Sequence, residues 1–202
     1  AQKKLGLKDD KGNSRITDKQ ISELEQYKTD LNLDVANAYE EKLKHDVMSH
    51  VKAYGDQAKS AKGIIHLGCT SRDITDNAEL FQTREALNLV RKKLVNAINY
   101  ISMNVAKYSE IMTLARTHYQ PAQATTVGRR LAMHGEELLL ALDDLEYRID
   151  SLPLRGIKGA VGTQADQLTL FNGDQSIVDS LDEMIRNQLG FNDSLHWTGQ
   201  TY

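Results

Sequence analysis

The sequence predicts an all-α protein built from long antiparallel helices. Apolar residues recur at helical spacing over long stretches of the 202-residue chain. The only two prolines, Pro121 and Pro153, lie between these stretches and not inside them, which leaves the helical patterns unbroken. No segment shows the strict alternation of apolar and polar residues that marks a half-buried strand. Long helices packed in a bundle are therefore the simplest fold class.

The first part of the chain predicts two shorter helices. Thr17 and Gln20 have the spacing of a capping box, and apolar residues follow at helical intervals up to Leu31. A second helix is predicted over residues 35–54. Segment 63–68, which begins and ends with glycine, is predicted to be a turn or a short extended piece.

Two long helices are predicted in the middle of the chain, over residues 74–108 and 131–152. Apolar residues recur every seven positions in both, at Leu80, Leu87, Leu94, Ile101 and Tyr108 in the first and at Leu131, Leu138, Leu145 and Leu152 in the second. This spacing is typical of antiparallel bundle helices. A last helix is predicted over residues 174–189. We expect an N-terminal helical domain over residues 1–70 and the first part of a long-helix bundle domain over residues 71–202.

The composition is that of a soluble globular protein and excludes several classes. Hydrophobic residues make up 40% and charged residues 26%, and the net charge of −3 comes from interleaved acids and bases, so a nucleic-acid partner is not expected. No apolar run approaches the ~18 residues of a membrane span. The single Cys69 has no second thiol for a disulfide. Without a secretory or transit segment, we expect a cytoplasmic protein whose partner is a small molecule or another subunit.

A histidine with polar neighbours stands at the break between the two long helices. His118 lies between Thr117 and Tyr119, and Pro121 prevents a regular helix from continuing through the segment. Histidine can transfer a proton near neutral pH, and threonine can hydrogen-bond a carboxylate. The residues thus predict a functional loop. The alternative is a helix connector with a surface histidine.

Lys44, His45 and Asp46 fall near the middle of the helix predicted over residues 35–54. Successive helical side chains point ~100° apart, so these three cannot converge by themselves, and a solvated helix face is the alternative interpretation. His50 follows His45 by five residues, a poor spacing for two zinc ligands on one helix face. We therefore expect no metal site.

Thr70 and Ser71 directly precede the first long helix. Free amides, hydroxyls and the helix dipole attract a carboxylate or phosphate at such a place, although an ordinary N-cap is the structural alternative. Segment 155–164 is glycine-rich but lacks the Gly-Lys-Ser/Thr ending of a phosphate-binding loop. We expect a tight loop lined by amides and Thr163.

Four motifs together resemble the adenylosuccinate lyase family, a branch of the fumarase and aspartase superfamily. They are Lys-His-Asp-Val-Met at 44–48, Gly-Cys-Thr-Ser-Arg-Asp-Ile-Thr-Asp-Asn at 68–77, Arg-Thr-His-Tyr-Gln-Pro-Ala-Gln at 116–123 and Arg-Gly-Ile-Lys-Gly-Ala-Val-Gly-Thr-Gln at 155–164. They stand in the order of the family, and the final Thr-Gly-Gln-Thr-Tyr at 198–202 agrees as well. The resemblance covers nearly the whole chain.

The resemblance implies a helical homotetramer that eliminates fumarate by general acid–base catalysis without a metal or organic cofactor. The substrates would be adenylosuccinate, which gives AMP, and the succinylated carboxamide ribotide SAICAR, which gives AICAR. His118 matches the general acid that protonates the departing nitrogen. Seven residues match substrate-binding positions, in sites that the family assembles from three subunits: Lys44, His45, Asp46, Thr70, Ser71, Thr117 and Gln200. Thr163 and Gln164 match the pocket wall.

One departure from the family pattern concerns the catalytic base. The loop Ser-Ser-x-Met-Pro-x-Lys-x-Asn, which carries the base serine, does not occur in the sequence, and neither does the N-terminal Arg-Tyr phosphate element. We therefore expect a segment of a longer enzyme that is essentially inactive alone. Two alternatives remain. Another fumarate-forming lyase, such as argininosuccinate lyase, agrees less well with residues 44–46 and 155–159, and a helical scaffold module would leave His118 without a role.

Overall fold

The computed structural model describes residues 1–202 and confirms the predicted helical fold class, with 57% of residues in helices and 8% in strands. The chain divides into two compact units. The first unit contains residues 1–81 and 153–202, and the second contains residues 82–152. Each unit is described by itself. The domain boundary expected at residue 70 remains a prediction.

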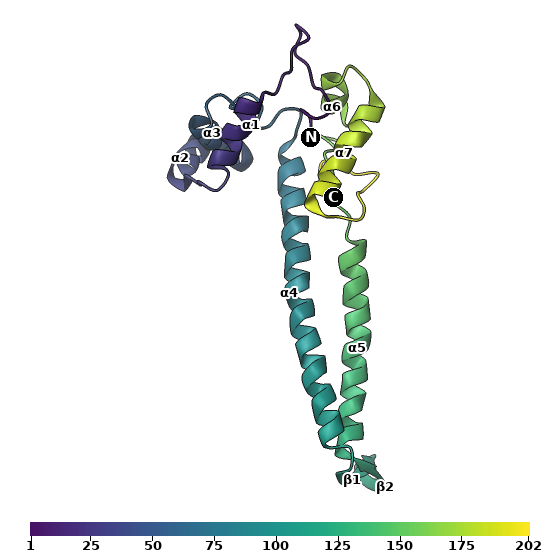
Figure 1. Cartoon of the computed structure of the whole chain (residues 1–202). Helices are drawn as coiled ribbons and strands as arrows, with labels where there is room; N and C mark the ends of the chain where they lie inside the picture. The colour runs from purple at the N-terminus through teal and green to yellow at the C-terminus, as the bar shows by residue number, and fades with distance from the viewer. The chain divides into compact units, whose positions relative to one another are not determined.

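The first unit contains the short helices. They are α1 (Asp18–Tyr27), α2 (Leu33–Leu43), α3 (Asp46–Gln57), the first turns of α4 (Ser71–Lys107), α6 (Ala165–Leu170) and α7 (Gln175–Leu189) (Figure 1). The predicted capping box is confirmed, because the Gln20 amide donates to Thr17 Oγ1 (3.3 Å) and the Thr17 amide donates to Gln20 Oε1 (2.8 Å). Helix α6 was not predicted from the apolar pattern.

The prediction of one helix over residues 35–54 was wrong in one respect, because the structure has two helices here that are separated at Lys44 and His45. Lys44 adopts a left-handed conformation (φ 52°, ψ 40°), and its amide donates to the Glu40 carbonyl (2.8 Å), which ends α2. His45 is extended and caps α3 with its ring. The apolar spacing runs on through this break, so a periodicity argument does not detect it. Residues 44–46 thus lie at a helix junction instead of a helix centre.

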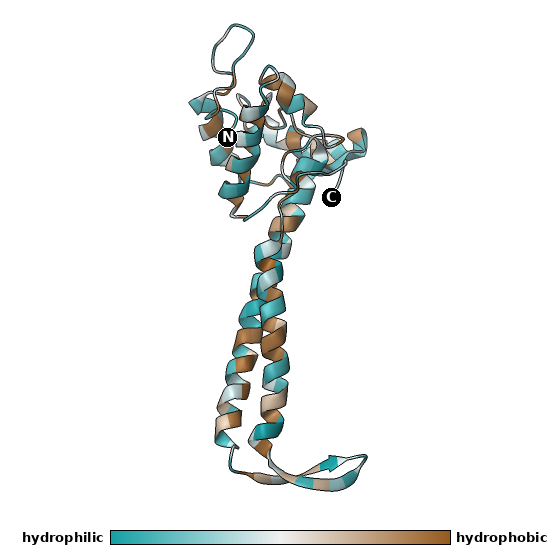
Figure 2. Cartoon of the chain, turned by 90° about the vertical axis from the view of Figure 1, so that its right-hand side faces the viewer, coloured by the Kyte–Doolittle hydropathy of each residue, from teal (hydrophilic) through white to brown (hydrophobic).

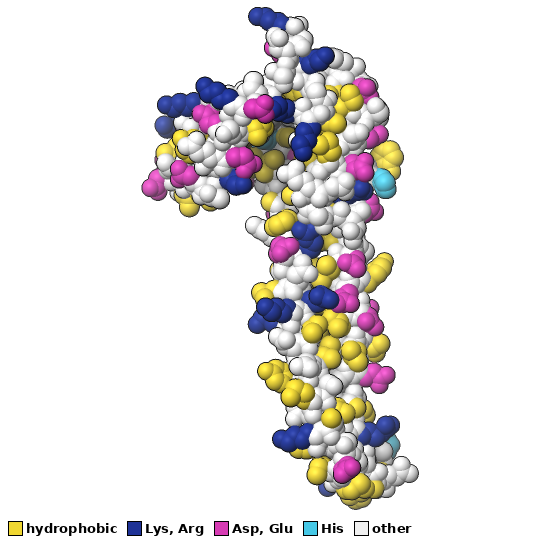
Figure 3. Space-filling model, viewed as in Figure 1, with side chains coloured by type: hydrophobic (Ala, Val, Ile, Leu, Met, Phe, Trp, Pro, Cys, Tyr) yellow, Lys and Arg dark blue, Asp and Glu magenta, His cyan; other side chains and the backbone are white.

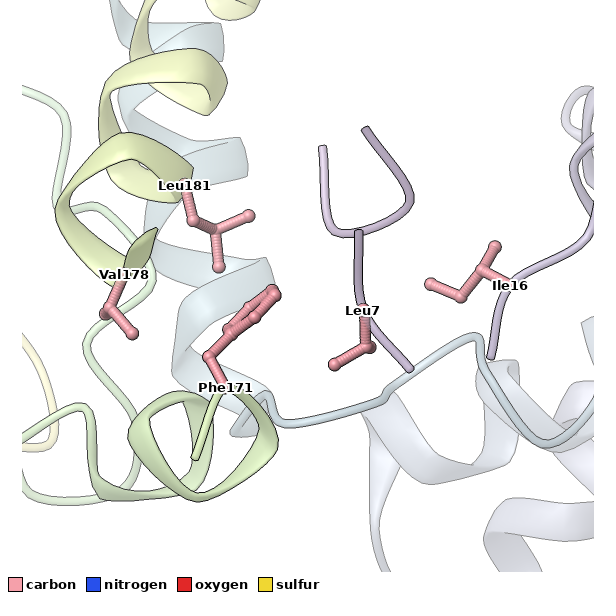
Figure 4. Packing of buried hydrophobic residues seen from close by; sticks show 5 residues of the cluster. All are labelled: Leu7, Ile16, Phe171, Val178 and Leu181. Atoms are coloured by element: carbon pink, nitrogen blue, oxygen red, sulfur yellow. The ribbon is translucent and has the colours of Figure 1, made fainter. Parts of the chain in front are cut away.

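The core of the first unit joins the start of the chain to its last helix. Leu7 and Ile16 pack with Phe171, Val178 and Leu181, and each side chain is at most 6% exposed (Figure 4). Burial of such a side chain stabilises the fold by about 1.5–3 kcal/mol. Because the cluster is formed from residues more than 150 positions apart, segments 1–16 and 171–181 hold each other in place.

The second unit is a helical hairpin closed by two strands. The remainder of α4 and helix α5 (Val127–Ser151) run side by side, and the pair β1 (Met112–Thr117) and β2 (Gln120–Thr126) connects them (Figures 1 and 2). Arg91 of α4 and Glu146 of α5 form an ion pair at 2.6 Å. The antiparallel packing predicted for the two long helices is therefore observed.

The strand pair is a correction to the sequence analysis, which predicted a loop without strands. The strands pair antiparallel from Met112 with Thr126 to Thr117 with Gln120, with an irregularity between Leu114 and Arg116. Alternation is missing from the sequence because neither face of this ribbon is buried. Pro121 is tolerated because a two-stranded ribbon consists only of edge strands.

The helical hairpin buries no hydrophobic side chain fully. All buried hydrophobic residues lie in the first unit, whereas the predicted heptad positions such as Leu94 and Leu138 are only half-buried. A second heptad series, Met133, Leu140 and Tyr147, is more than half exposed on α5. Hydrophobic side chains accordingly appear among charged ones on the visible surface of α4 and α5 (Figure 3). No helix combines the length and the apolar character needed to cross a membrane.

The close approach of α5 to the end of α4 makes Gly128 sensitive to substitution. A Cβ on Gly128 would lie 2.5 Å from the Val105 carbonyl oxygen and 2.8 Å from the Ser109 backbone. On Gly135 it would lie 3.0 Å from only the Ile101 side chain, which can move. We expect Gly128→Ala to lower the free energy of unfolding by about 1–3 kcal/mol. Gly135→Ala, aided by the helix propensity of alanine, should be near neutral. Urea unfolding of both variants tests this, and equal losses would contradict it.

Candidate functional site

The junction between α2 and α3 places His45 against the start of α4. The ring Nδ1 of His45 accepts a hydrogen bond from the Met48 amide (3.4 Å), and its Nε2 lies 3.2 Å from Ser71 Oγ. Because Nδ1 is an acceptor here, the ring proton of the neutral imidazole resides on Nε2 and is donated to Ser71. The serine hydroxyl then keeps its own proton available for an anionic ligand. Asp46 lies 3.5 Å from Nδ1 and is mostly exposed.

A buried carboxylate, Asp73, fixes the first turn of α4. Asp73 Oδ2 accepts from the Thr70 amide (2.8 Å), so the backbone that carries the Thr70 and Ser71 hydroxyls has one conformation. Asp73 is 1% exposed, whereas Thr70 and Ser71 are partly accessible. The Thr70 amide is thus already hydrogen-bonded within the chain and is not free to bind an anion. Of the predicted anion-binding groups, the partly accessible hydroxyls of Thr70 and Ser71 remain.

The glycine-rich loop lies mostly in the interior, not at the surface. Residues 154–159 are almost wholly buried, and Gly156, Gly159 and Gly162 all have positive φ, as expected for a tight loop. Arg155 is fully buried and donates to Asp73. Lys158 pairs with the buried Asp182 of α7. The loop therefore carries buried charge that the sequence analysis did not foresee.

Gln200 lies on a segment that this buried charge holds. Its backbone carbonyl accepts from Arg155 Nη2 (2.8 Å), while the residue itself is exposed. Thr201 Oγ1 donates to Asp76 Oδ2 (2.8 Å). In the same loop, Gln164 donates to the Ile157 carbonyl (3.2 Å), and Thr163 is exposed.

Thr117 and His118 belong to the second unit, at the tip of the β1–β2 hairpin. His118 and Tyr119 form the two-residue turn, with φ of 49° and 62°. Such turns strongly prefer Asn-Gly or Gly, and a non-glycine residue in this region costs about 1 kcal/mol or more. Tyr119 is 98% exposed and His118 is exposed too. A strained backbone that presents two side chains to solvent favours a functional role for this turn over that of a simple connector.

The predicted site residues fall into two groups. The first group lies in the first unit, where the His45–Ser71 contact joins residues 44–46 to residues 70–71 and Asp73 holds Thr70. Gln200 joins them through Arg155, which contacts both Asp73 and the Gln200 carbonyl. Thr117 and His118 form the other group in the second unit. No group of three His, Cys, Asp or Glu side chains is arranged to hold a metal ion.

A histidine missed by the sequence analysis lines a cavity of about 300 Å³ in the first unit. His66 Nε2 is buried without a hydrogen-bond partner, and His50, Val47 and Ile74 line the same cavity. A buried nitrogen of this kind is rare and marks a place where a polar group is expected. The sequence signal would have been its position four residues before Thr70, in a segment interpreted only as a turn.

Cys69 is a protonated thiol in this environment. Burial raises the pKa of the thiol to about 12, and the charges of Asp73 and Asp166 contribute in the same direction. The thiolate is the reactive form, so the side chain is not a nucleophile at neutral pH.

This pKa predicts slow modification of Cys69. At pH 8 the folded chain should react with a thiol reagent about 1000-fold more slowly than the urea-unfolded chain. The reason is that the raised pKa makes the reactive thiolate about 1000-fold less populated in the folded chain. The raised pKa also means that folding stability is lost as the pH rises from the ordinary thiol pKa of 9.0 towards about 12, because only the unfolded chain releases the thiol proton in this range. Disulfide-exchange absorbance at pH 8 measures the rates. Similar rates in both states would contradict the burial of the thiol.

Comparison with known sequences gives one consistent result. The profile of a family described as "Lyase" matches residues 10–192. Over its whole length the chain is 43% identical to adenylosuccinate lyase of Schizosaccharomyces pombe, 41% to that of Saccharomyces cerevisiae and 40% to that of Caenorhabditis briggsae. It spans 41% of the length of each of these relatives.

Comparison with solved structures supports the fold alone. Fumarate lyase from Mesorhizobium sp. BNC1 superposes with a TM-score of 0.74 at 19% identity, covering 91% of this chain and 42% of that one. The 3-carboxy-cis,cis-muconate lactonizing enzyme from Pseudomonas putida gives 0.71 at 23% identity, covering 91% and 41%. The helical bundle is thus shared with larger enzymes.

Proposed function

We infer that this chain, which belongs to the lyase family, is a segment of an adenylosuccinate lyase. The observation that carries the proposal is the identity of 40–43% along the entire chain with relatives of that name. The complete protein would eliminate fumarate from adenylosuccinate to give AMP, and from SAICAR to give AICAR. We propose a cytoplasmic enzyme that needs no metal or organic cofactor for this chemistry.

In the proposed mechanism, His118 acts as the general acid. A base outside this chain removes a proton from the succinyl carbon, and the electrons of that C–H bond form the double bond of fumarate. The adjacent C–N bond breaks, and the departing nitrogen takes a proton from the His118 imidazolium. Thr117, next to it at the hairpin tip, supplies a hydroxyl for the same substrate. The exposed, strained turn at residues 118–119 supports this role.

The His45–Ser71 pair is proposed to bind a carboxylate of the succinyl group. The imidazole donates to Ser71 Oγ, which orients the serine proton towards an anion. Thr70 adds a second hydroxyl, and Lys44 and Asp46 flank the pair with charges of opposite sign. Gln200 completes the substrate-binding set with an amide that can donate or accept.

The full protein is proposed to be a homotetramer whose sites combine residues of several subunits. The helical hairpin of the second unit has no buried hydrophobic side chain and an exposed heptad series on α5. Helices with such a surface are stable in water when partner helices cover it. A scaffold module would use the same surface, and another fumarate-forming lyase such as argininosuccinate lyase would share the fold. The relatives' names favour adenylosuccinate cleavage over both.

The role of His118 predicts a large and specific loss of turnover. In the full-length protein, His118→Gln should lower kcat for adenylosuccinate cleavage by about 10²–10⁴-fold, because the leaving nitrogen loses its proton donor. His134→Gln, an equally polar change at an exposed histidine of α5, is the matched control and should leave kcat unchanged. The loss of substrate absorbance measures the rate. A kcat within twofold of the control would refute the role of His118.

The shared-site proposal predicts that assembly and activity fail together. Leu140, in the exposed series of α5, is 62% exposed, and Leu33 of α2 is 54% exposed. Leu140→Lys in the full-length protein should shift the tetramer to smaller species and lower activity, whereas Leu33→Lys should do neither. Light scattering coupled to the absorbance assay tests this. A fully active monomer would exclude a site shared between subunits, and self-association without any turnover would favour the scaffold.

A further inference from the structure

We propose that Arg155 is a positioning residue that fixes the backbone of Gly199 and Gln200 relative to the start of α4. The residues that form this arrangement are Arg155, Asp73, Asp76 and Gly162, and we call them the Arg155 clamp. The proposal rests on the proposed role of Gln200 in substrate binding. It adds a buried side chain that touches no substrate but determines where two substrate-binding segments lie.

Arg155 uses its guanidinium on two sides. Nη1 donates to Asp73 Oδ1, and Nε lies 3.4 Å from Asp76 Oδ2, at ion-pair distance. On the other side, Nη2 donates to the carbonyls of Gly159 (3.2 Å), Gly199 (3.2 Å) and Gln200 (2.8 Å). The side chain is completely buried. One rigid, planar group thus joins α4, its own loop and segment 199–200.

The two aspartates extend the clamp in opposite directions. Asp73 accepts from the Thr70 amide, which orients the residues that precede α4. Asp76 accepts from Thr201 Oγ1 (2.8 Å) and from the Tyr202 amide (3.3 Å). Both carboxylates are at most 1% exposed. Arg155 is the buried cation beside both of them, and Arg72 adds a second, partly exposed ion pair to Asp76 at 3.3 Å. A change at Arg155 therefore reaches Thr70 and Gln200 at the same time.

Gly162 contributes to the clamp because its backbone lies directly against segment 198–199. It has φ of +86°, and a Cβ at this position would overlap the carbonyl oxygen of Thr198. Absence of a side chain is thus required for segment 198–200 to reach Arg155. Gly173 has nearly the same backbone conformation (φ +82°) but nothing within 4 Å of a Cβ. The two glycines differ only in whether an added methyl group displaces the Gln200 segment.

The test compares Gly162→Ala with Gly173→Ala in the full-length protein. Both glycines have a positive φ of nearly the same size, so the strain that alanine suffers at this angle is common to the two variants. We expect Gly162→Ala to raise KM for adenylosuccinate by about tenfold or more, with a smaller change in kcat, because a displaced binding group weakens substrate binding. Gly173→Ala should keep the wild-type KM. Equal KM values in the two variants would overturn the proposal.

Arg155→Lys provides a second, independent test of the proposal. Lysine keeps the positive charge between the aspartates but lacks the planar fork that reaches the carbonyls of Gly159, Gly199 and Gln200. We expect the same rise in KM of about tenfold, and a wild-type KM would overturn the proposal even where Gly162→Ala does not fold.

Amide hydrogen exchange of residues 199–202 separates failure of the clamp from failure of the proposed function. If the wild-type protein does not cleave adenylosuccinate, the proposed function fails. Faster exchange in Gly162→Ala than in Gly173→Ala would still support the clamp, and equal exchange would remove it.

Discussion

The buried guanidinium of Arg155 is the interaction on which the first unit depends. Removing Arg155, Asp73 and Asp76 from water is costly, and their mutual attraction offsets that cost only when the geometry is complete and the remaining donors are satisfied. Here Nη2 donates to backbone carbonyls of two loops, whereas Nε lies at ion-pair distance from Asp76 without a hydrogen bond. Such a network adds little net stability compared with apolar packing, but it admits one arrangement of the segments that it joins. The hydrophobic cluster around Phe171 stabilises the unit, and the ionic network specifies it.

The His45–Ser71 pair shows how short-range structure prepares a polar site. His45 serves as a helix cap with one nitrogen, and this use determines the tautomer that presents the proton of the other nitrogen to Ser71. Ser71 in turn stands on a helix whose first turn is held by Asp73. The Ser71 hydroxyl is therefore held by hydrogen bonds around it, which would lower the entropy lost if it binds the proposed anion.

Much of this could be predicted from the sequence, because helix periodicity and capping act over few residues. The heptad spacing of residues 74–108 and the Thr17–Gln20 box required no tertiary information, and the helices formed as expected. The break at Lys44 could not be read, since a left-handed cap leaves the apolar pattern unchanged. The hairpin around His118 has no buried face to impose alternation. Arg155 gave no local signal either, because its partners lie 82 and 45 positions away.

The two units differ in what completes them. The first has a buried core, a buried ionic network and a polar site with defined hydrogen bonds. The second presents His118 on a strained turn at the end of a helix pair that buries none of its hydrophobic side chains fully. A strained turn persists only when its surroundings over-determine it, and a bare helix pair supplies few constraints. Partner helices that cover the exposed series Met133, Leu140 and Tyr147 would supply those constraints. Assembly and the placement of the proposed acid would then be one physical event.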